Sequence, residues 1–303
     1  MAGVYALHPG RPFRAAEPAP GVQIVNAPSD LIKLDHMPLT AVIFDWAGTT
    51  VDHGSRAPVA TLQEVFEEAG LPITVEEARL SMGIAKRDHI ASILALPRVS
   101  PEWERAHGSK PGEADVDRLY ASFVPKQLAC LARYSDVIPG VPSAVEQLRA
   151  RGLKIGSTTG YTRPMLDFLL TLAKDQGFAP DCAVCPGEVP GGGRPAPWMG
   201  YLNAIRLEVS PLWTMIKIGD TPSDIAEGLN AGMWTIGISR TGNEAGLTAA
   251  EWDAMPAAER PEVLARAGSR LREAGAHYVA ESVADCLGMI HEIAARLAAG
   301  ERP

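Results

Sequence analysis

The stretch AVIFDWAGTT, residues 41–50, decides the fold of this chain and supplies its first candidate site residue. Its apolar first half predicts a buried strand that ends at Asp45, and the Gly-Thr-Thr sequence predicts a turn. A carboxylate held at such a strand end is a candidate nucleophile beside a phosphate-sized pocket. The alternative is an aspartate that only caps the turn. Because position 47 is alanine, help for a leaving group must come from elsewhere in the chain.

Length and composition exclude several classes of protein. The chain has 303 residues, of which 46% are hydrophobic and 21% charged, so it can bury one large core or a core with a satellite domain. Its formal net charge of −8 predicts no nucleic-acid partner, whereas a small anionic substrate needs only a few local cations. No run approaches the roughly 20 apolar residues of a membrane span, and the N-terminus lacks the apolar core of a signal peptide. We therefore expect no membrane partner and a cytoplasmic location.

The four cysteines do not form a disulfide framework in a chain of this length. Cys182 and Cys185 have the spacing of a redox or metal pair. They lie in a short apolar run, and no second cysteine or histidine pair accompanies them. Plain packing in a reducing compartment is the favoured interpretation.

Periodicity divides the chain into three parts. Residues 1–38 are rich in Pro, Ala and Gly and predict a tail, whereas residues 56–135 are almost entirely helical in pattern. From residue 136 on, strands and helices alternate, which indicates βαβ units on a parallel sheet. The predicted fold is α/β: one core domain made of residues 39–55 and 136–303, interrupted after its first strand by a helical insertion.

Local signals place some helix ends. Thr74 with Glu77 and Thr248 with Glu251 have the spacing of capping boxes. Pro125 predicts a bend or break in the long helical stretch 113–134.

Polar residues follow three of the predicted strands, and they should meet at one edge of the sheet. Besides Asp45, these are Thr158 with Thr159, and Asp220 with Asp224 one helical turn further on. Asp220 and Asp224 are candidate ligands for Mg²⁺ together with Asp45, because hard oxygen ligands suit that ion. Helix capping in the GDTPSD sequence is an equally good explanation of the two acids alone.

Two further residues complete this set. The Thr159 hydroxyl can donate to a phosphate oxygen, and Arg194, in the loop GGGRPAPWM, can clamp a phosphoryl oxygen. Each residue alone is a weak signal, because threonines are common at strand ends and a loop arginine is more often a solvated charge. The order strand-Asp, strand-Thr, loop cation, strand-Asp is far more specific than any member.

That order resembles the haloacid-dehalogenase superfamily of phosphotransferases. Longer stretches, AVIFDWAGTTVD, MGIAKRDHI, IGSTTGYTR, GRPAPWM, IKIGDTPSD and AGMWTIG, resemble one family in it, the phosphonatases or phosphonoacetaldehyde hydrolases. The superfamily resemblance implies a Rossmann-like parallel-sheet core with a mobile α-helical cap domain, here residues 56–135. The closer one implies hydrolysis of phosphonoacetaldehyde (2-oxoethylphosphonate) to acetaldehyde and phosphate, with Mg²⁺ and a homodimer joined through cap helices.

The chemistry of a phosphonate explains why alanine can stand at position 47. A carbon leaving group departs as a carbanion, which a nearby carboxyl protonates poorly. An amine that condenses with the neighbouring aldehyde instead withdraws the electrons as a protonated imine. Lys86 stands in MGIAKRDH, where a lysine is commonly only a solvated surface charge. The family resemblance implies that Lys86 forms the Schiff base.

The resemblance also implies roles for neighbouring residues. His89, three residues after Lys86, is expected to shuttle protons, although a structural hydrogen bond is an alternative for such a histidine. Tyr161 and Met82 are expected to line the substrate pocket. The backbone carbonyl of Ala47 is expected to bind the metal. Asp45 is expected to form an aspartyl-phosphate that water then cleaves.

Two positions depart from the family pattern. Ser55 stands where that pattern has a cysteine, and the glycine run 191–193 is one residue longer before Arg194. Any role of that cysteine thiol must therefore be dispensable here or be taken by the Ser55 hydroxyl. The second puts the placement of the Arg194 guanidinium in doubt.

Other functions on the same fold make different demands on the sequence. A phosphate-ester phosphatase is expected to carry an acid at position 47, and a dehalogenase needs no pair such as Asp220 and Asp224. A non-catalytic binding protein would be favoured by loss of Asp45, Lys86 or Asp220, and all three are present. The sequence therefore favours the hydrolase.

Overall fold

The computed structural model describes residues 38–303. The predicted tail lies outside the described residues except for Pro38, so that prediction is not tested. The other sequence predictions fall on the described part of the chain.

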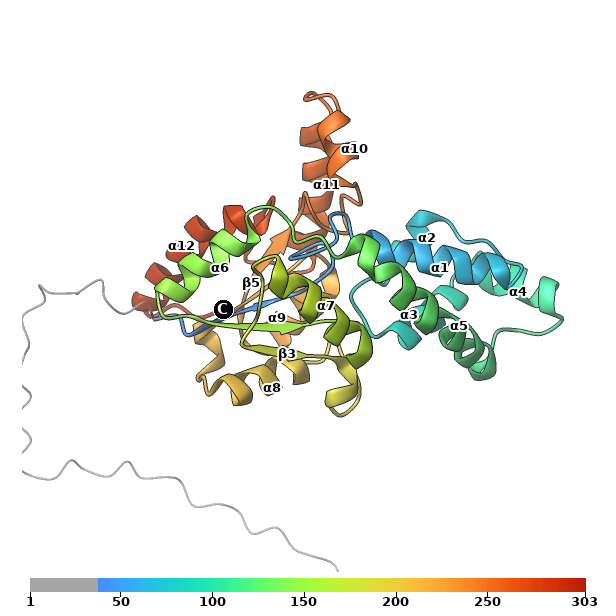
Figure 1. Ribbon diagram of the computed structural model, residues 1–303, viewed down its shortest axis with the longest axis horizontal. Helices are drawn as coiled ribbons and strands as arrows, with labels where there is room; N and C mark the ends of the chain where they lie inside the picture. The colour runs from blue at the N-terminus through green and yellow to red at the C-terminus, as the bar shows by residue number, and fades with distance from the viewer. Residues whose placement is uncertain (1–37) are drawn as a thin grey trace, which may run out of the picture. The chain divides into compact units, whose positions relative to one another are not determined.

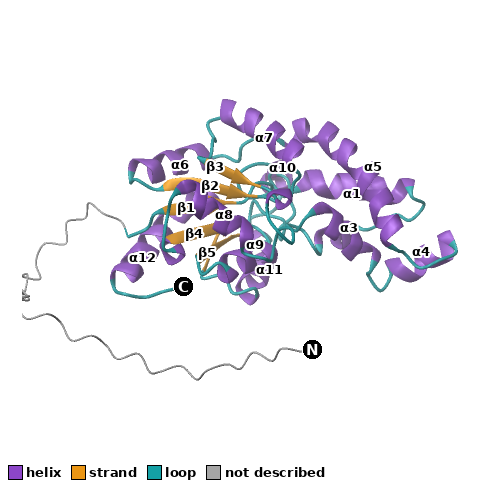
Figure 2. Cartoon of the chain, turned by 90° about the horizontal axis from the view of Figure 1, so that it is seen from below, coloured by secondary structure: helices purple, strands orange, loops and turns teal. Residues whose placement is uncertain are grey.

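Six parallel strands form the sheet at the centre of the fold (Figure 2). Their order is β3-β2-β1-β4-β5-β6, so the chain builds outward from β1 on one side and then returns to continue on the other. Ligands bind beyond the carboxyl ends of strands at such a reversal, here between β1 and β4. The strands are β1 Ala41–Phe44, β2 Lys154–Thr158, β3 Cys182–Val184, β4 Met215–Gly219, β5 Trp234–Ile238 and β6 Tyr278–Ala280.

Different helices cover the two faces of the sheet. Alternate residues of β1 point to opposite faces. Val42 and Phe44 pack in the cluster that includes α6, α7 and α12, whereas Ala41 and Ile43 pack with α8. The helices of the core are α6 Val141–Ala150, α7 Arg163–Asp175, α8 Trp198–Leu207, α9 Pro222–Asn230, α10 Ala249–Ala254, α11 Arg260–Glu273 and α12 Cys286–Ala298.

Five α-helices are inserted between β1 and α6, the helix that leads into β2, and Figure 1 shows them beside the sheet and its covering helices. The helices α1 and α3 both pack on α5. The predicted α/β class with a helical insertion is therefore confirmed, whereas the domain boundaries at 55/56 and 135/136 stay a prediction. The inserted helices are α1 Arg56–Glu68, α2 Val75–Arg79, α3 Lys86–Leu94, α4 Val99–His107 and α5 Glu113–Leu131.

The predicted capping boxes are confirmed at both helix starts. Thr74 and Glu77 exchange backbone and side-chain bonds at α2, and Thr248 and Glu251 do so at α10. Of the predicted bend or break at Pro125, the break is wrong, because α5 continues through it, and the bend stays a prediction. Packing against α1 and α3 holds this helix despite the hydrogen bond that a proline cannot make.

Candidate active site

The three predicted acids converge at the carboxyl ends of the two central strands. Asp45 follows β1, Asp220 follows β4, and Asp224 lies in the first turn of α9. One carboxylate oxygen of each lies within 4.8 Å of the others, and all three residues are buried. The capping interpretation also holds for part of the sequence, because Thr221 is the N-cap of α9 and Asp224 completes its capping box. Asp224 therefore serves the helix start and the acidic cluster together.

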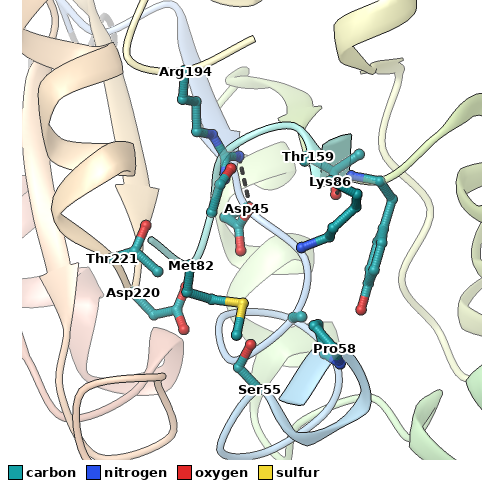
Figure 3. A pocket seen from close by; sticks show the side chains of 13 residues that line it. Asp45, Ser55, Pro58, Met82, Lys86, Thr159, Arg194, Asp220 and Thr221 are labelled. Carbon is teal, nitrogen blue, oxygen red and sulfur yellow. Dashed lines mark hydrogen bonds and ion pairs between the residues drawn. The ribbon is translucent and has the colours of Figure 1, made fainter. Parts of the chain in front are cut away.

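Arg194 joins the acids into one network. Its Nη2 lies 2.6 Å from Asp45 Oδ1, its Nη1 3.0 Å from Asp224 Oδ1, and its Nε 3.0 Å from Glu227 Oε2. Figure 3 shows the guanidinium directed at Asp45, with the ion pair drawn as a dashed line. The longer glycine run therefore does not displace this side chain from the site.

Two members of this network, Lys217 and Glu227, were not predicted from the sequence. Lys217 in β4 lies 3.0 Å from Asp224 Oδ1 and 3.2 Å from Glu227 Oε2. The Thr158 hydroxyl donates to Glu227 at 2.8 Å and accepts from Lys217 at 2.7 Å. A lysine inside an otherwise apolar strand, and an acid three residues after Asp224 on one helix face, were the signals that could have revealed them.

Burial and charge shift the pKa values of the acids in different directions. Burial, and then repulsion from Asp224, raise the pKa of Asp45 despite Arg194 and Lys217. Burial and the charges of Asp45 and Asp224 raise the pKa of Asp220 well above its usual value. Burial opposes ionisation of Asp224 as well, but Arg194 and Lys217 outweigh it and lower its pKa.

The network fits a divalent cation. In the part of the chain that the structure describes, the ion pairs of its carboxylates involve only the two cations Arg194 and Lys217, so the four carboxylates, at Asp45, Asp220, Asp224 and Glu227, outnumber these cations by two. A divalent ion at the three aspartates supplies the missing positive charge and relieves the repulsion that raises the pKa of Asp220. Among the described residues, no other group of three or more such side chains lies close enough to hold a metal.

The inserted helices bring Lys86 to the same pocket (Figure 3). Lys86 is the first residue of α3 and only 5% exposed, and its Nζ lies 5.2 Å from the centre of the Tyr161 ring. Burial is the main cause that lowers the pKa of Lys86 to about 8, against the opposing charge of Asp45. The helix N-terminus acts in the same direction, because its dipole disfavours a cation.

The remaining predicted pocket residues are also in place. Ala47, Met82, Thr159 and Tyr161 line the pocket together with Ser55, the residue that departs from the family pattern. The Thr159 hydroxyl accepts a hydrogen bond from the Tyr161 amide, so its own proton is free to be donated to a ligand.

His89 is the one predicted site residue that belongs neither to the pocket lining nor to the network of buried charges. It shares α3 with Lys86, as predicted, but is fully buried and does not line the pocket. In the described part of the chain, neither ring nitrogen has a hydrogen-bond partner. Burial, and then the charge of Lys86, lower the pKa of His89 to about 3. The ring is therefore neutral near pH 7, and its role as a proton shuttle stays a prediction.

The inserted helices lie tightly against the core at the pocket. The Met82 carbonyl accepts from Ser223 Oγ at 3.2 Å, and the Gly83 carbonyl accepts from Arg194 Nη1 at 3.1 Å. A Cβ on Gly83 would lie 2.4 Å from Thr221 Oγ1, so only glycine permits this approach. The pocket has a cavity volume of about 20 Å³, which is room for about one water. A substrate therefore enters only when the helices move apart or side chains rearrange.

The cysteine prediction agrees with the structure. Cys130, Cys182, Cys185 and Cys286 are all free and buried. Within residues 38–303, no helix is both long enough and apolar enough to cross a bilayer.

Comparison with known proteins identifies the family. The model of the haloacid dehalogenase-like hydrolases matches residues 39–232. A phosphonoacetaldehyde hydrolase of Nitratidesulfovibrio vulgaris is 47% identical, over 88% of this chain and 95% of its own. The chain belongs to the phosphonoacetaldehyde hydrolase family. A second family member, the phosphonoacetaldehyde hydrolase of Paraburkholderia phytofirmans, is also 47% identical, over 87% of this chain and 98% of its own.

Solved structures agree with this membership. A phosphonoacetaldehyde hydrolase-like protein of Oleispira antarctica superposes with a TM-score of 0.86 at 42% identity, over 88% of this chain and 96% of its own. A β-phosphoglucomutase of Clostridium difficile has a TM-score of 0.63 at 18% identity, over 86% of this chain and 99% of its own. The second likeness shows the fold alone. Like the rest of the phosphonoacetaldehyde hydrolase family, this chain is a hydrolase of the haloacid dehalogenase superfamily.

Proposed function

We propose that this chain hydrolyses the carbon–phosphorus bond of phosphonoacetaldehyde to give acetaldehyde and phosphate. One observation carries the proposal: a buried lysine from the inserted helices and a buried aspartate from the core line the same small pocket. The names of relatives at 47% identity support the same substrate.

The amine acts on the carbon side of the bond. The neutral Lys86 amine attacks the aldehyde carbonyl, and loss of water gives a protonated imine. When the carbon–phosphorus bond breaks, its electron pair flows to the imine nitrogen and forms an enamine. Protonation of the enamine at carbon and hydrolysis of the iminium release acetaldehyde and regenerate the amine. His89 enters this scheme as a proton shuttle only when the helices are open, because its ring does not line the closed pocket.

The carboxylate acts on the phosphorus side. Asp45 attacks phosphorus as the bond to carbon breaks, and water then cleaves the aspartyl-phosphate. Arg194, which lies 2.6 Å from Asp45, is placed to share its guanidinium with the phosphoryl oxygens, and the Thr159 hydroxyl donates to one of them. Mg²⁺ would be held by Asp45, Asp220 and the Ala47 carbonyl, with Asp224 as a further ligand or a neighbour, and would neutralise charge at phosphorus.

The assembly and location of the enzyme are part of the same proposal. We infer a homodimer joined through the inserted helices and a cytoplasmic enzyme. The family resemblance supports the dimer, and the four free cysteines support a reducing compartment. Light scattering of the purified chain tests the dimer: a single species at the monomer mass contradicts it.

Trapping with borohydride tests the reaction. The full chain is incubated with phosphonoacetaldehyde, Mg²⁺ and borohydride, and the adduct is mapped by peptide mass spectrometry. We expect a reduced adduct on Lys86, and Mg²⁺-dependent phosphate release in a parallel sample without borohydride. The Lys126→Arg variant, altered at an exposed ion-paired lysine, is the matched control and should give the same adduct. Phosphate release with no adduct on Lys86 would contradict the imine mechanism. Faster release from a simple phosphate ester would favour the phosphatase alternative.

A further inference from the structure

Arg79, the last residue of α2, reaches from the inserted helices to the core loop 241–246. Its Nη1 donates to Asn243 Oδ1 at 2.8 Å and to the Asn243 carbonyl at 3.2 Å. Its Nη2 donates to the Gly246 carbonyl at 3.1 Å, and Nη1 also donates to the Gly54 carbonyl at 3.0 Å. Only a guanidinium, with several donors fixed in one plane, can make this set of bonds.

The loop is shaped for this side chain. Gly246 has a φ of +69°, and a Cβ added there would lie 2.9 Å from Arg79 Cζ. Any larger residue would be strained and would meet the guanidinium.

The same loop holds Asp220. The Asn243 amide donates to Asp220 Oδ2 at 2.7 Å, and a Cβ on Gly242 would lie 2.6 Å from the Asp220 Cβ. The Thr241 hydroxyl donates to the Gly48 carbonyl at 2.8 Å, in the turn that follows Asp45. The loop therefore contacts Arg79 of the inserted helices, Asp220 of the acidic cluster and the turn that follows Asp45.

We propose that Arg79 is a positioning residue that couples closure of the inserted helices to the orientation of Asp220. Arg79 can bond Asn243 only while the helices lie against the core. Those bonds fix the residue whose amide directs the Asp220 carboxylate toward the metal. The proposal rests on the proposed function, because it takes Asp220 as a ligand of Mg²⁺.

The place of Arg79 in the chain gives this coupling a consequence for the reaction. Arg79 precedes Met82 and Gly83, which contact the core, and Lys86 follows them on α3. One movement of this segment therefore brings the Lys86 amine to the carbon side of the scissile bond and orients Asp220 on the phosphorus side. Phosphorus is attacked only when the amine is in place.

Calorimetric titration of the full chain with Mg²⁺ tests the proposal. Loss of a group that orients a metal ligand typically weakens metal binding by about 10–100-fold, and we expect this range for Arg79→Ala. Arg79→Lys keeps the charge but not the planar set of donors and should also bind Mg²⁺ more weakly than the wild type. Asn243→Ala keeps the backbone amide that donates to Asp220 and loses the side-chain oxygen that accepts from Arg79. The double variant with Arg79→Ala should therefore bind no more weakly than Arg79→Ala alone.

Arg98→Ala is the matched control. Arg98 pairs with Glu77 of α2 and with Glu102 on the exposed surface of the inserted helices. Removing it perturbs the same helices without touching loop 241–246, and Mg²⁺ affinity should not change.

The outcomes separate a positioning role from a structural one. A lower thermal midpoint of Arg79→Ala with wild-type Mg²⁺ affinity means that Arg79 only holds the helices, and it overturns the proposal. If Arg79→Ala does not fold, wild-type Mg²⁺ affinity in both Arg79→Lys and Asn243→Ala overturns it. A wild-type chain that binds no Mg²⁺ and releases no phosphate contradicts both the proposed function and this inference. If the wild type is active but the Arg79 variants keep wild-type Mg²⁺ affinity, only the inference about Arg79 is wrong.

Discussion

The two sides of the pocket surround their candidate reactive groups with different neighbours, although burial is the main cause of the pKa shift on both. On the core side, Asp45 is ion-paired with Arg194 within a network of buried charges. On the side of the inserted helices, none of the ion pairs in the described part of the chain involves Lys86, and burial lowers its pKa to about 8. A nucleophilic carboxylate must stay ionised and needs cations beside it. A nucleophilic amine must lose its proton, so it is buried without a paired acid.

The largest expected effect comes from removing one reactive group at a time. Lys86→Arg and Asp45→Asn should each lower phosphate release by at least ~10³-fold, because each deletes a nucleophile of the proposed mechanism. The two variants should differ in trapping: borohydride should still fix the aldehyde on Lys86 in Asp45→Asn, and should fix nothing at position 86 in Lys86→Arg. Circular dichroism checks that both are folded. An Asp45→Asn variant that forms no adduct would show that the two sides do not act separately.

The next effect concerns the charge network on the core side. Glu227→Ala takes away the acceptor of the buried Arg194 Nε and one of the two acids beside Lys217, so the free energy of unfolding should fall by about 1–3 kcal/mol. Urea denaturation measures the change. The control is Glu68→Ala, which breaks an exposed ion pair with Lys126 and should lower the free energy of unfolding far less, because solvent screens that pair. Equal losses in the two variants would contradict the distinction between buried and exposed pairs.

A smaller effect is the pH dependence on the side of the inserted helices. Only the neutral amine attacks an aldehyde, and its fraction rises with pH through the pKa of about 8. The rate of borohydride trapping on Lys86 should therefore rise by about tenfold per pH unit below 8 and level off above it. Adduct formation is followed by mass spectrometry from pH 6 upward. A midpoint near the ordinary lysine value of 10.5 would show that burial does not tune this amine.

The smallest expected effect is at position 47. An acid introduced by Ala47→Asp should give no gain in phosphate release from phosphonoacetaldehyde, because in the proposed mechanism the leaving electrons flow to the Lys86 imine and not to an atom beside residue 47. The steady-state kcat of the variant measures this. A large gain would show that the leaving group needs an acid and would weaken the division of labour between Lys86 and Asp45.

Much of the core could be predicted from local sequence. The strand that ends at Asp45, the capping boxes at Thr74 and Thr248, and the parallel order of strands and helices all depend on residues close together in the chain. The long helical stretch 113–134 was predicted, but its continuity through Pro125 was not, because packing on other helices outweighs the local signal.

The site residues also divide into those that could be predicted from the sequence and those that could not. Asp45, Thr159, Asp220 and Asp224 were found because strand ends in a parallel sheet meet at one edge, a rule that needs no side-chain detail. Glu227 and Lys217 were missed because their partners come from other elements, and His89 was expected in a pocket that its buried ring does not reach.

The sequence by itself determined which chemistry this chain can perform: an aspartate at a strand end, alanine two residues on, and a lysine in the inserted helices. These depend on residue type and local position. Only the tertiary structure decided how each group is tuned, since the pKa of Lys86 depends on burial and the charge of Asp45 on Arg194, 149 positions away in the printed sequence. Desolvation and Coulomb energy depend on distances in space, which the order of residues does not contain.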